Sequence, residues 1–286
     1  FDSSFYNAGF TVNSINDYLP FLQSIPVEKY PRYLLLSLDH MMFNEACDSL
    51  RVTPPVSFWQ SSFRLYPRIG VYQAAFRDVF SGKYPVISSG KKDGTTRIGL
   101  NAEVNNTGFR NDGSMYYGTQ IPKLLSNDTT ADDHNYANTL ERIRKGNMRF
   151  EYGNSVNRNA LLELDSLLGY CKNNQVEVIA FLPPFADKVY SSMVNSGKYP
   201  YLDSLYASIK SVHDKYGYEF YDFSSMSRCN SNDTETIDGM HGSEHTYIKL
   251  LIKMLESGSK LKQVTSIERL KQDEARKLNR LEVYGN

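Results

Sequence analysis

Two short runs of consecutive apolar residues constrain the fold of this chain more than any other feature. They occupy residues 33–38 (Tyr-Leu-Leu-Leu-Ser-Leu) and residues 176–182 (Val-Glu-Val-Ile-Ala-Phe-Leu). Each is far shorter than the ~20 apolar residues that span a bilayer, and neither alternates as regularly as a half-exposed strand does. Runs of this kind are typical of parallel strands that helices cover on both faces.

The chain around these runs has the spacing of amphipathic helices, in which apolar residues recur every three or four positions. We expect helices over residues 13–24, 157–174, 201–216, 243–255 and 260–281, and a third strand over residues 219–223. Strands that alternate with helices in this way predict an α/β fold with three layers (αβα) and a mostly parallel, flavodoxin-like sheet.

The same pattern predicts the domain organisation. We expect one α/β domain over residues 1–256, with an irregular insertion at about 82–156, and a charged C-terminal helix within residues 257–286. The first expected helix has no strand before it, although a helix in such a fold normally connects two strands. The first strand is therefore expected to be missing, or to lie upstream of Phe1.

The composition excludes several classes of protein. The chain has 32 Lys and Arg against 32 Asp and Glu, so it lacks the basic surface of a nucleic-acid-binding protein. From its first residues we expect no signal peptide. Its 21 Tyr and many Asn residues suit a carbohydrate-binding surface and an extracytoplasmic location, although an organism's compositional habit explains them equally well. The three cysteines give no zinc spacing, and a pairing of Cys47 with Cys229 stays open.

The strongest candidate for chemistry is the segment Asp238-Gly-Met-His241, which follows the third expected strand. A carboxylate three residues before a histidine can accept a hydrogen bond from one ring nitrogen and leave the other nitrogen free as a general base. In a parallel sheet, ligands bind beyond the carboxyl ends of the strands, where this segment should lie. The alternative is a turn in which Asp238 caps backbone amides and His241 is merely exposed.

A second interpretation uses overlapping residues. The stretch His241-Gly-Ser-Glu-His245 has the H-x-x-E-H pattern of inverted zinc proteases. Zinc binding would need both histidines on one face of a helix, whereas Ser243 is expected to cap the helix and leave His241 outside it. The main interpretation requires no metal and no cofactor.

The block from Asp238 to His241, followed by Gly-Ser and a helix, resembles the last conserved block of SGNH (GDSL-like) hydrolases. It is most similar to the branch linked to bacterial polysaccharide O-acetylation, which includes the alginate acetylation proteins. Further similar stretches are residues 6–10 (Tyr-Asn-Ala-Gly-Phe), 33–44, 97–101, 108–114 and 181–185. Their order and spacing extend the resemblance from Tyr6 to about Leu255.

The resemblance implies roles for matching residues. Asp238 and His241 would be the acid and base of a Ser-His-Asp triad. Gly9 would match the block whose backbone amide helps form the oxyanion hole. Asp39 falls near the third block, but the usual Gly-x-Asn-Asp of that block is absent, so Asn44 is considered as a substitute donor.

The resemblance also implies a nucleophilic serine in a turn after the first strand. That block would precede residues 6–10, so the serine is expected upstream of Phe1, together with the membrane anchor common in such relatives. The implied partners are a polysaccharide acceptor and a membrane-bound O-acyltransferase that supplies the acyl group.

These observations lead to one main expectation and two alternatives. The main expectation is an extracytoplasmic, SGNH-like acyltransferase or esterase that acts, with acetyl as the expected group, on hydroxyls of a cell-surface polysaccharide. The first alternative is a catalytically degenerate protein of the same fold that binds glycan or acts as a scaffold. The second is a zinc hydrolase at His241 and His245.

Overall fold

The structure is a computed structural model that describes residues 7–8, 12, 14–47, 72–73, 76–77, 79–82, 106–110 and 112–284. The chain divides into two compact units. The first comprises Phe1–Leu50 and Tyr117–Asn286, and the second comprises Arg51–Tyr116. None of the described helices is long and apolar enough to cross a membrane.

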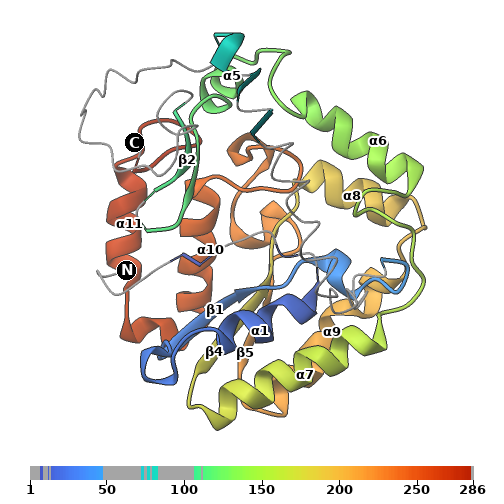
Figure 1. Cartoon of the computed structure of the whole chain (residues 1–286), viewed down its shortest axis with the longest axis vertical. Coiled ribbons are helices and arrows are strands. Elements are labelled where there is room, and N and C mark those ends of the chain that lie inside the picture. The colour runs from blue at the N-terminus through green and yellow to red at the C-terminus, as the bar shows by residue number, and fades with distance from the viewer. Residues whose placement is uncertain are drawn as a thin grey trace. The chain divides into compact units, whose positions relative to one another are not determined.

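The core of the first unit is a parallel sheet with the strand order β1-β4-β5 (Figure 1). Its strands are β1 (Tyr33–Ser37), β4 (Glu177–Leu182) and β5 (Glu219–Asp222). In the register of the sheet, Leu35 lies opposite Ile179, and Phe181 lies opposite Tyr221. The α/β class and the parallel sheet expected from the apolar runs are confirmed.

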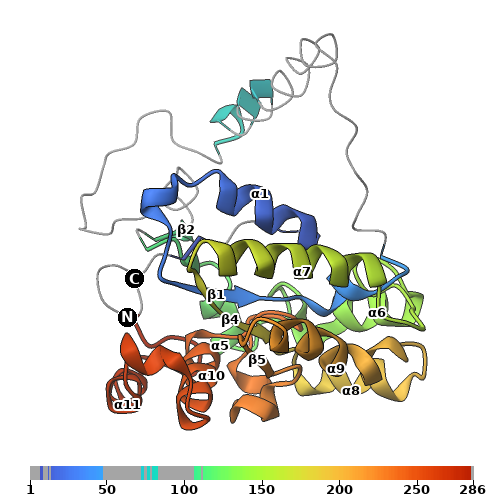
Figure 2. The same cartoon turned by 90° about the horizontal axis from the view of Figure 1, so that it is seen from below.

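Helices cover both faces of the sheet. They are α7 (Arg158–Asn173), α9 (Tyr201–Asp214), α10 (Glu244–Glu256) and α11 (Ile267–Ala275). Val178, Ala180 and Leu182 of β4 belong to the apolar cluster that includes α7 and α9, whereas Ile179 and Phe181 belong to the cluster with α10 and α11. Figure 2 shows α7 and α10 on opposite sides of the strands. This arrangement is compatible with three αβα layers.

Polar side chains fix where the expected helices begin. The side chain of Asn157 accepts hydrogen bonds from the backbone N–H groups of Asn159 and Ala160 at the start of α7. Ser243 caps α10 through Thr246 N. The helix expected over residues 13–24 begins at Ser14, which forms a capping box before a 3₁₀ turn and α1 (Tyr18–Gln23). Such caps satisfy amide groups that have no partner within the helix.

The continuous helix expected over residues 260–281 is wrong. The segment forms a 3₁₀ turn (Lys260–Gln263), breaks, and resumes as α11, which ends at Ala275. Ser266 has extended backbone angles (φ −134°, ψ 158°), and its hydroxyl caps Arg269 N. Serine competes for backbone groups in this way, and the apolar spacing on either side of it concealed the break.

Three shorter helices of the first unit were not predicted. They are α5 (Ile121–Leu125), α6 (Ala137–Lys145) and α8 (Asp187–Asn195). Tyr136, directly before α6, has a left-handed backbone with φ +63°, and sequence patterns give no signal for such a residue. The bounds expected for the domains and for the insertion stay predictions.

Two short strands between residues 107 and 117 pair as a second sheet. It consists of β2 (Thr107–Phe109) and β3 (Met115–Tyr117). Arg110 N donates to Ser114 O at 2.8 Å. Gly113 adopts φ +82°, a conformation that glycine accepts at little cost.

All three cysteines are free thiols. The Sγ of Cys47 lies 2.9 Å from Oε2 of Glu151, and the buried Sγ of Cys229 donates to the carbonyl oxygen of Met226 at 3.2 Å. The pairing of Cys47 with Cys229 is therefore not formed.

A buried histidine in α9 makes the stability of the fold dependent on pH. The ring of His213 stacks on Phe220 at 4.9 Å between centroids, and its Nδ1 donates to the carbonyl oxygen of Ile209 at 3.0 Å. Its Nε2 is buried without a hydrogen-bond partner in the described structure. Burial lowers the pKa of His213 to about 4, so the imidazole is neutral in the folded protein at neutral pH.

We predict that the free energy of unfolding decreases as the pH falls from about 6.5 to about 4. Over this range the unfolded histidine binds a proton that the folded one does not, which corresponds to about 3 kcal/mol for a shift of this size. The substitution His213→Phe, which keeps a ring against Phe220, should flatten the profile measured by urea unfolding. An unchanged slope in this variant would contradict the assignment.

Candidate functional site

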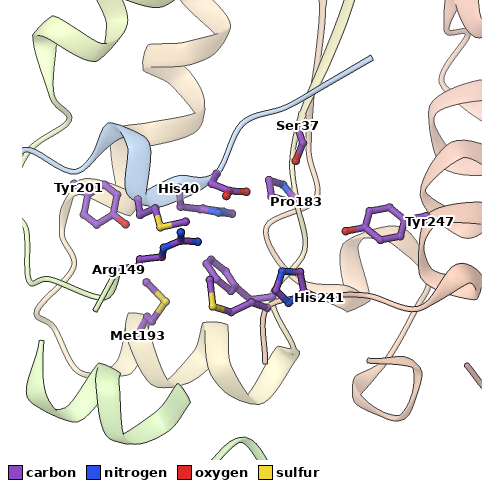
Figure 3. A pocket seen from close by; sticks show the side chains of 12 residues that line it. Ser37, His40, Arg149, Pro183, Met193, Tyr201, His241 and Tyr247 are labelled. Atoms are coloured by element: carbon purple, nitrogen blue, oxygen red, sulfur yellow. The ribbon is translucent and has the colours of Figure 1, made fainter. Parts of the chain in front are cut away.

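The carboxyl ends of the strands meet around a pocket of about 170 Å³ (Figure 3). Ser37 and Asp39 line it from the end of β1, and His241 lines it from the loop before α10. Tyr247 of α10, Arg149 of the loop after α6, and His40 add further polar side chains to the lining. Segments far apart in the sequence thus converge at the rim where ligands of parallel sheets bind.

Asp238 and His241 form a hydrogen-bonded pair at this rim. Nδ1 of His241 lies 2.8 Å from Oδ2 and 3.0 Å from Oδ1 of Asp238. An ionised carboxylate only accepts hydrogen bonds, so Nδ1 carries a proton, and in the neutral imidazole Nε2 keeps its lone pair. Within the described residues, no hydrogen bond engages Nε2. The imidazole can therefore accept a proton at a defined atom.

The same carboxylate also shapes the turn that holds the histidine. Oδ1 of Asp238 accepts from the backbone N–H groups of Met240 at 2.7 Å and His241 at 2.8 Å. The turn-capping role considered as an alternative is thus present together with the contact to the imidazole. One side chain fixes both the backbone and the ring of His241.

Two glycines allow the turn to pack closely. A Cβ on Gly239 would lie 2.9 Å from Val189 Cγ2, and a Cβ on Gly242 would lie 2.6 Å from Thr246 Cγ2. Both distances are shorter than van der Waals contact. The sequence Asp-Gly-Met-His-Gly therefore supplies a hydrogen-bond acceptor for the imidazole. It also supplies two residues without a Cβ atom where the turn packs closely.

The electrostatics of the pair favour a basic imidazole. The hydrogen bond to Asp238 raises the pKa of His241, although burial opposes this. Burial alone would raise the pKa of Asp238, but its hydrogen bonds, chiefly with His241, hold that pKa below its usual value. The side chain of His241 is 53 % exposed and that of Asp238 is 27 % exposed, so an incoming substrate can reach the imidazole.

A second carboxyl group faces the pair across the pocket. Asp39 follows β1 and begins a 3₁₀ turn (His40–Phe43). Burial raises the pKa of Asp39, while the nearby His241 and Arg149 partly offset the effect. The ring of Tyr117 lies 6.4 Å from the ring of His241, between centroids. Asp39 was a candidate from the sequence, whereas Arg149 was not.

His40 forms a polar relay that sequence reasoning missed. Its Nε2 lies 2.8 Å from Oγ of Ser224, and that hydroxyl lies 2.5 Å from Oδ1 of Asp222. Since the serine proton goes to the carboxylate, His40 donates from Nε2. Burial lowers the pKa of His40 to about 4. His40 also lines a second cavity of about 300 Å³.

The candidate Asn44 does not line the pocket. The buried Asn44 donates from Nδ2 to Glu151 O at 2.7 Å and accepts from Ala46 N at 3.0 Å. Its amide is therefore engaged in holding neighbouring backbone. Gly9 lies outside the described residues.

The histidines of the zinc alternative are separated by the helix start. His241 precedes the cap of α10, whereas His245 lies in its first turn, is buried and donates from Nε2 to the carbonyl oxygen of Asn279 at 2.9 Å. Across the described ranges, no group of three or more His, Cys, Asp or Glu side chains is arranged to hold a metal ion.

Comparison of the chain with family models, curated proteins and solved structures finds no match. The chemistry of the site is therefore argued from its own geometry.

We predict that Asp238→Asn lowers the pKa of His241. The asparagine oxygen can still accept from the two backbone N–H groups, so the turn should form. The –NH₂ group that replaces Oδ2 cannot accept from Nδ1, and the negative charge that favours the imidazolium is lost. An NMR titration of the histidine ring protons measures the effect. The matched control is Asp165→Asn, because Asp165 binds Lys215 away from the pocket. An unshifted His241 pKa in Asp238→Asn would contradict the account.

Proposed function

We propose that this chain carries the base of an SGNH-like acyltransferase or esterase that acts on carbohydrate hydroxyls. The observation that carries the proposal is the Asp238–His241 pair, whose Nε2 is open to a pocket at the carboxyl rim of a parallel sheet. The resemblance of residues 238–243 to the last SGNH block supports it. An oriented histidine with a free nitrogen is the arrangement required to activate a hydroxyl nucleophile.

The proposed mechanism transfers one proton twice. His241 Nε2 removes the proton of a serine hydroxyl as the serine oxygen bonds to the acyl carbon and the carbonyl π electrons move to oxygen. When the carbonyl re-forms, the leaving oxygen takes the proton from His241. Asp238 stays ionised and stabilises the imidazolium. Attack by a sugar hydroxyl on the acyl-enzyme gives transfer, and attack by water gives hydrolysis.

The nucleophile of this proposal comes from a strand that pairs with the outer edge of β1. Leu38 N donates to Phe181 O, and Glu177 N donates to Arg32 O. The backbone N–H and C=O groups of the even-numbered residues of β1 therefore point toward β4. The backbone groups of Tyr33, Leu35 and Ser37 then face the other edge. No strand of the described ranges pairs with this edge, although the Tyr18 hydroxyl donates to Ser37 O at 2.6 Å. A strand added there would end beside the pocket.

The location and the partners of the proposal derive from the family resemblance. The enzyme would act outside the cytoplasm on a cell-surface polysaccharide, with acetyl as the proposed group. A membrane-bound O-acyltransferase would supply the acyl donor. A segment upstream of Phe1 would provide the serine and an anchor.

We predict that His241→Ala in the full-length protein lowers acyl turnover by at least about 100-fold, since general-base catalysis contributes 10²–10⁴-fold. Release of acetate from an acetylated oligosaccharide, and transfer to an unacetylated one, measure both outcomes. The control His134→Ala changes a loop histidine outside the pocket and should keep the wild-type rate.

Full activity in His241→Ala would contradict the proposal. A wild-type protein that binds the oligosaccharide without acyl turnover, with binding unchanged by Asp238→Asn, would instead support the glycan-binding alternative.

A further inference from the structure

A strained stretch of backbone presents Arg149 to the pocket. Met148 has φ +52° and Arg149 has φ +81°, so two successive residues that are not glycine lie in the left-handed region. L-amino acids with side chains avoid this region. Such residues persist where the surrounding structure fixes them, and they cluster at functional sites.

The residues that follow Arg149 are firmly held. The side chain of Phe150 is 1 % exposed, and the hydroxyl of Tyr199 donates to Phe150 O at 2.8 Å. The amide of Asn44 donates to Glu151 O at 2.7 Å. These contacts fix the backbone behind Arg149. The candidate Asn44 thus acts on the loop that carries the arginine.

The side chain of Arg149 points into the pocket. Figure 3 shows its guanidinium group extending toward the middle of the space that His40 and His241 border. Its charge lowers the pKa of Asp39 and of His241, beside the larger effects of burial on the first and of Asp238 on the second. The cation therefore lies close enough to influence both reactive groups.

We propose that Arg149 is the side-chain donor that stabilises the oxyanion formed on the acyl carbonyl. The proposal rests on the proposed acyl-transfer function. The position expected to carry an amide donor holds the carboxyl group of Asp39, and the Asn44 amide is engaged elsewhere. A guanidinium group has five N–H donors, so Arg149 can donate to an incoming oxygen while it keeps its interactions within the protein.

In the proposed reaction, Arg149 stabilises the negative charge that develops on the carbonyl oxygen as the serine attacks. As the serine oxygen bonds to the acyl carbon, the carbonyl electrons move to oxygen and a guanidinium N–H donates to it. When the carbonyl re-forms and the leaving oxygen takes the proton from His241, this hydrogen bond weakens. Donors fixed in advance at such an oxygen lower the barrier without reorganisation.

The test compares Arg149→Met and Arg149→Lys in the full-length enzyme, with Arg144→Met as the control. Arg144 lies on the same segment, is exposed and pairs with Glu141. For Arg149→Met we expect kcat to fall by about 100-fold and KM to change little, with partial recovery in Arg149→Lys. A phosphonate transition-state analogue should lose affinity in parallel with kcat/KM. Arg144→Met should behave as wild type.

A further variant separates catalysis from folding. Arg149→Gly places glycine at a left-handed position, so the protein should melt no lower than Arg149→Met while it stays inactive. Wild-type kcat in Arg149→Met, with activity lost in His241→Ala, would overturn the role of Arg149 and leave the proposed function intact. Activity that survives both substitutions would overturn the proposed function itself.

Discussion

The contact between the Asp238 carboxylate and Nδ1 of His241, at 2.8 Å, is the interaction on which the site depends. It sets the tautomer of the imidazole, and it raises the pKa of His241, which makes the imidazole a stronger base. The same carboxylate accepts two backbone N–H groups of its own turn. Because one group performs both tasks, the orientation of the ring and the shape of the turn are coupled.

The parallel sheet brings residues from distant segments next to this local pair, and together they line a pocket. The ends of β1 and β4 contribute Asp39 and Pro183, and the left-handed loop contributes Arg149. The carboxyl group of Asp39, the guanidinium group of Arg149 and the imidazoles of His40 and His241 then line one small pocket. In the proposed reaction, proton transfer from a hydroxyl to His241 would create an imidazolium while an oxyanion forms on the acyl group, and Asp238 and Arg149 would offer an opposite charge to each.

Much of this fold could be predicted because it follows from local patterns. Continuous apolar runs predicted β1 and β4, and Asn157 and Ser243 were correctly expected to begin helices. The C-terminal break at Ser266 was missed because apolar residues at helical spacing flank it. Hydrophobic periodicity shows which face of a segment is buried and does not show where the backbone stops being helical.

The central pair of the site was predictable because its two residues are close in sequence. Asp238 and His241 are three positions apart, so a single turn brings them together. Arg149 reaches the pocket through left-handed backbone that non-glycine sequence does not signal, and its neighbours across the pocket come from distant segments. Asn44 has an amide group that could donate to an oxyanion. In the fold, however, that amide donates to the backbone carbonyl oxygen of Glu151.

Covalent trapping of the full-length protein with a fluorophosphonate tests most directly whether His241 activates a hydroxyl. The account predicts one adduct, located by peptide mass spectrometry on a serine, and no adduct in His241→Ala. A wild-type protein that takes no label, or a His241→Ala variant labelled at the same rate, would contradict the account.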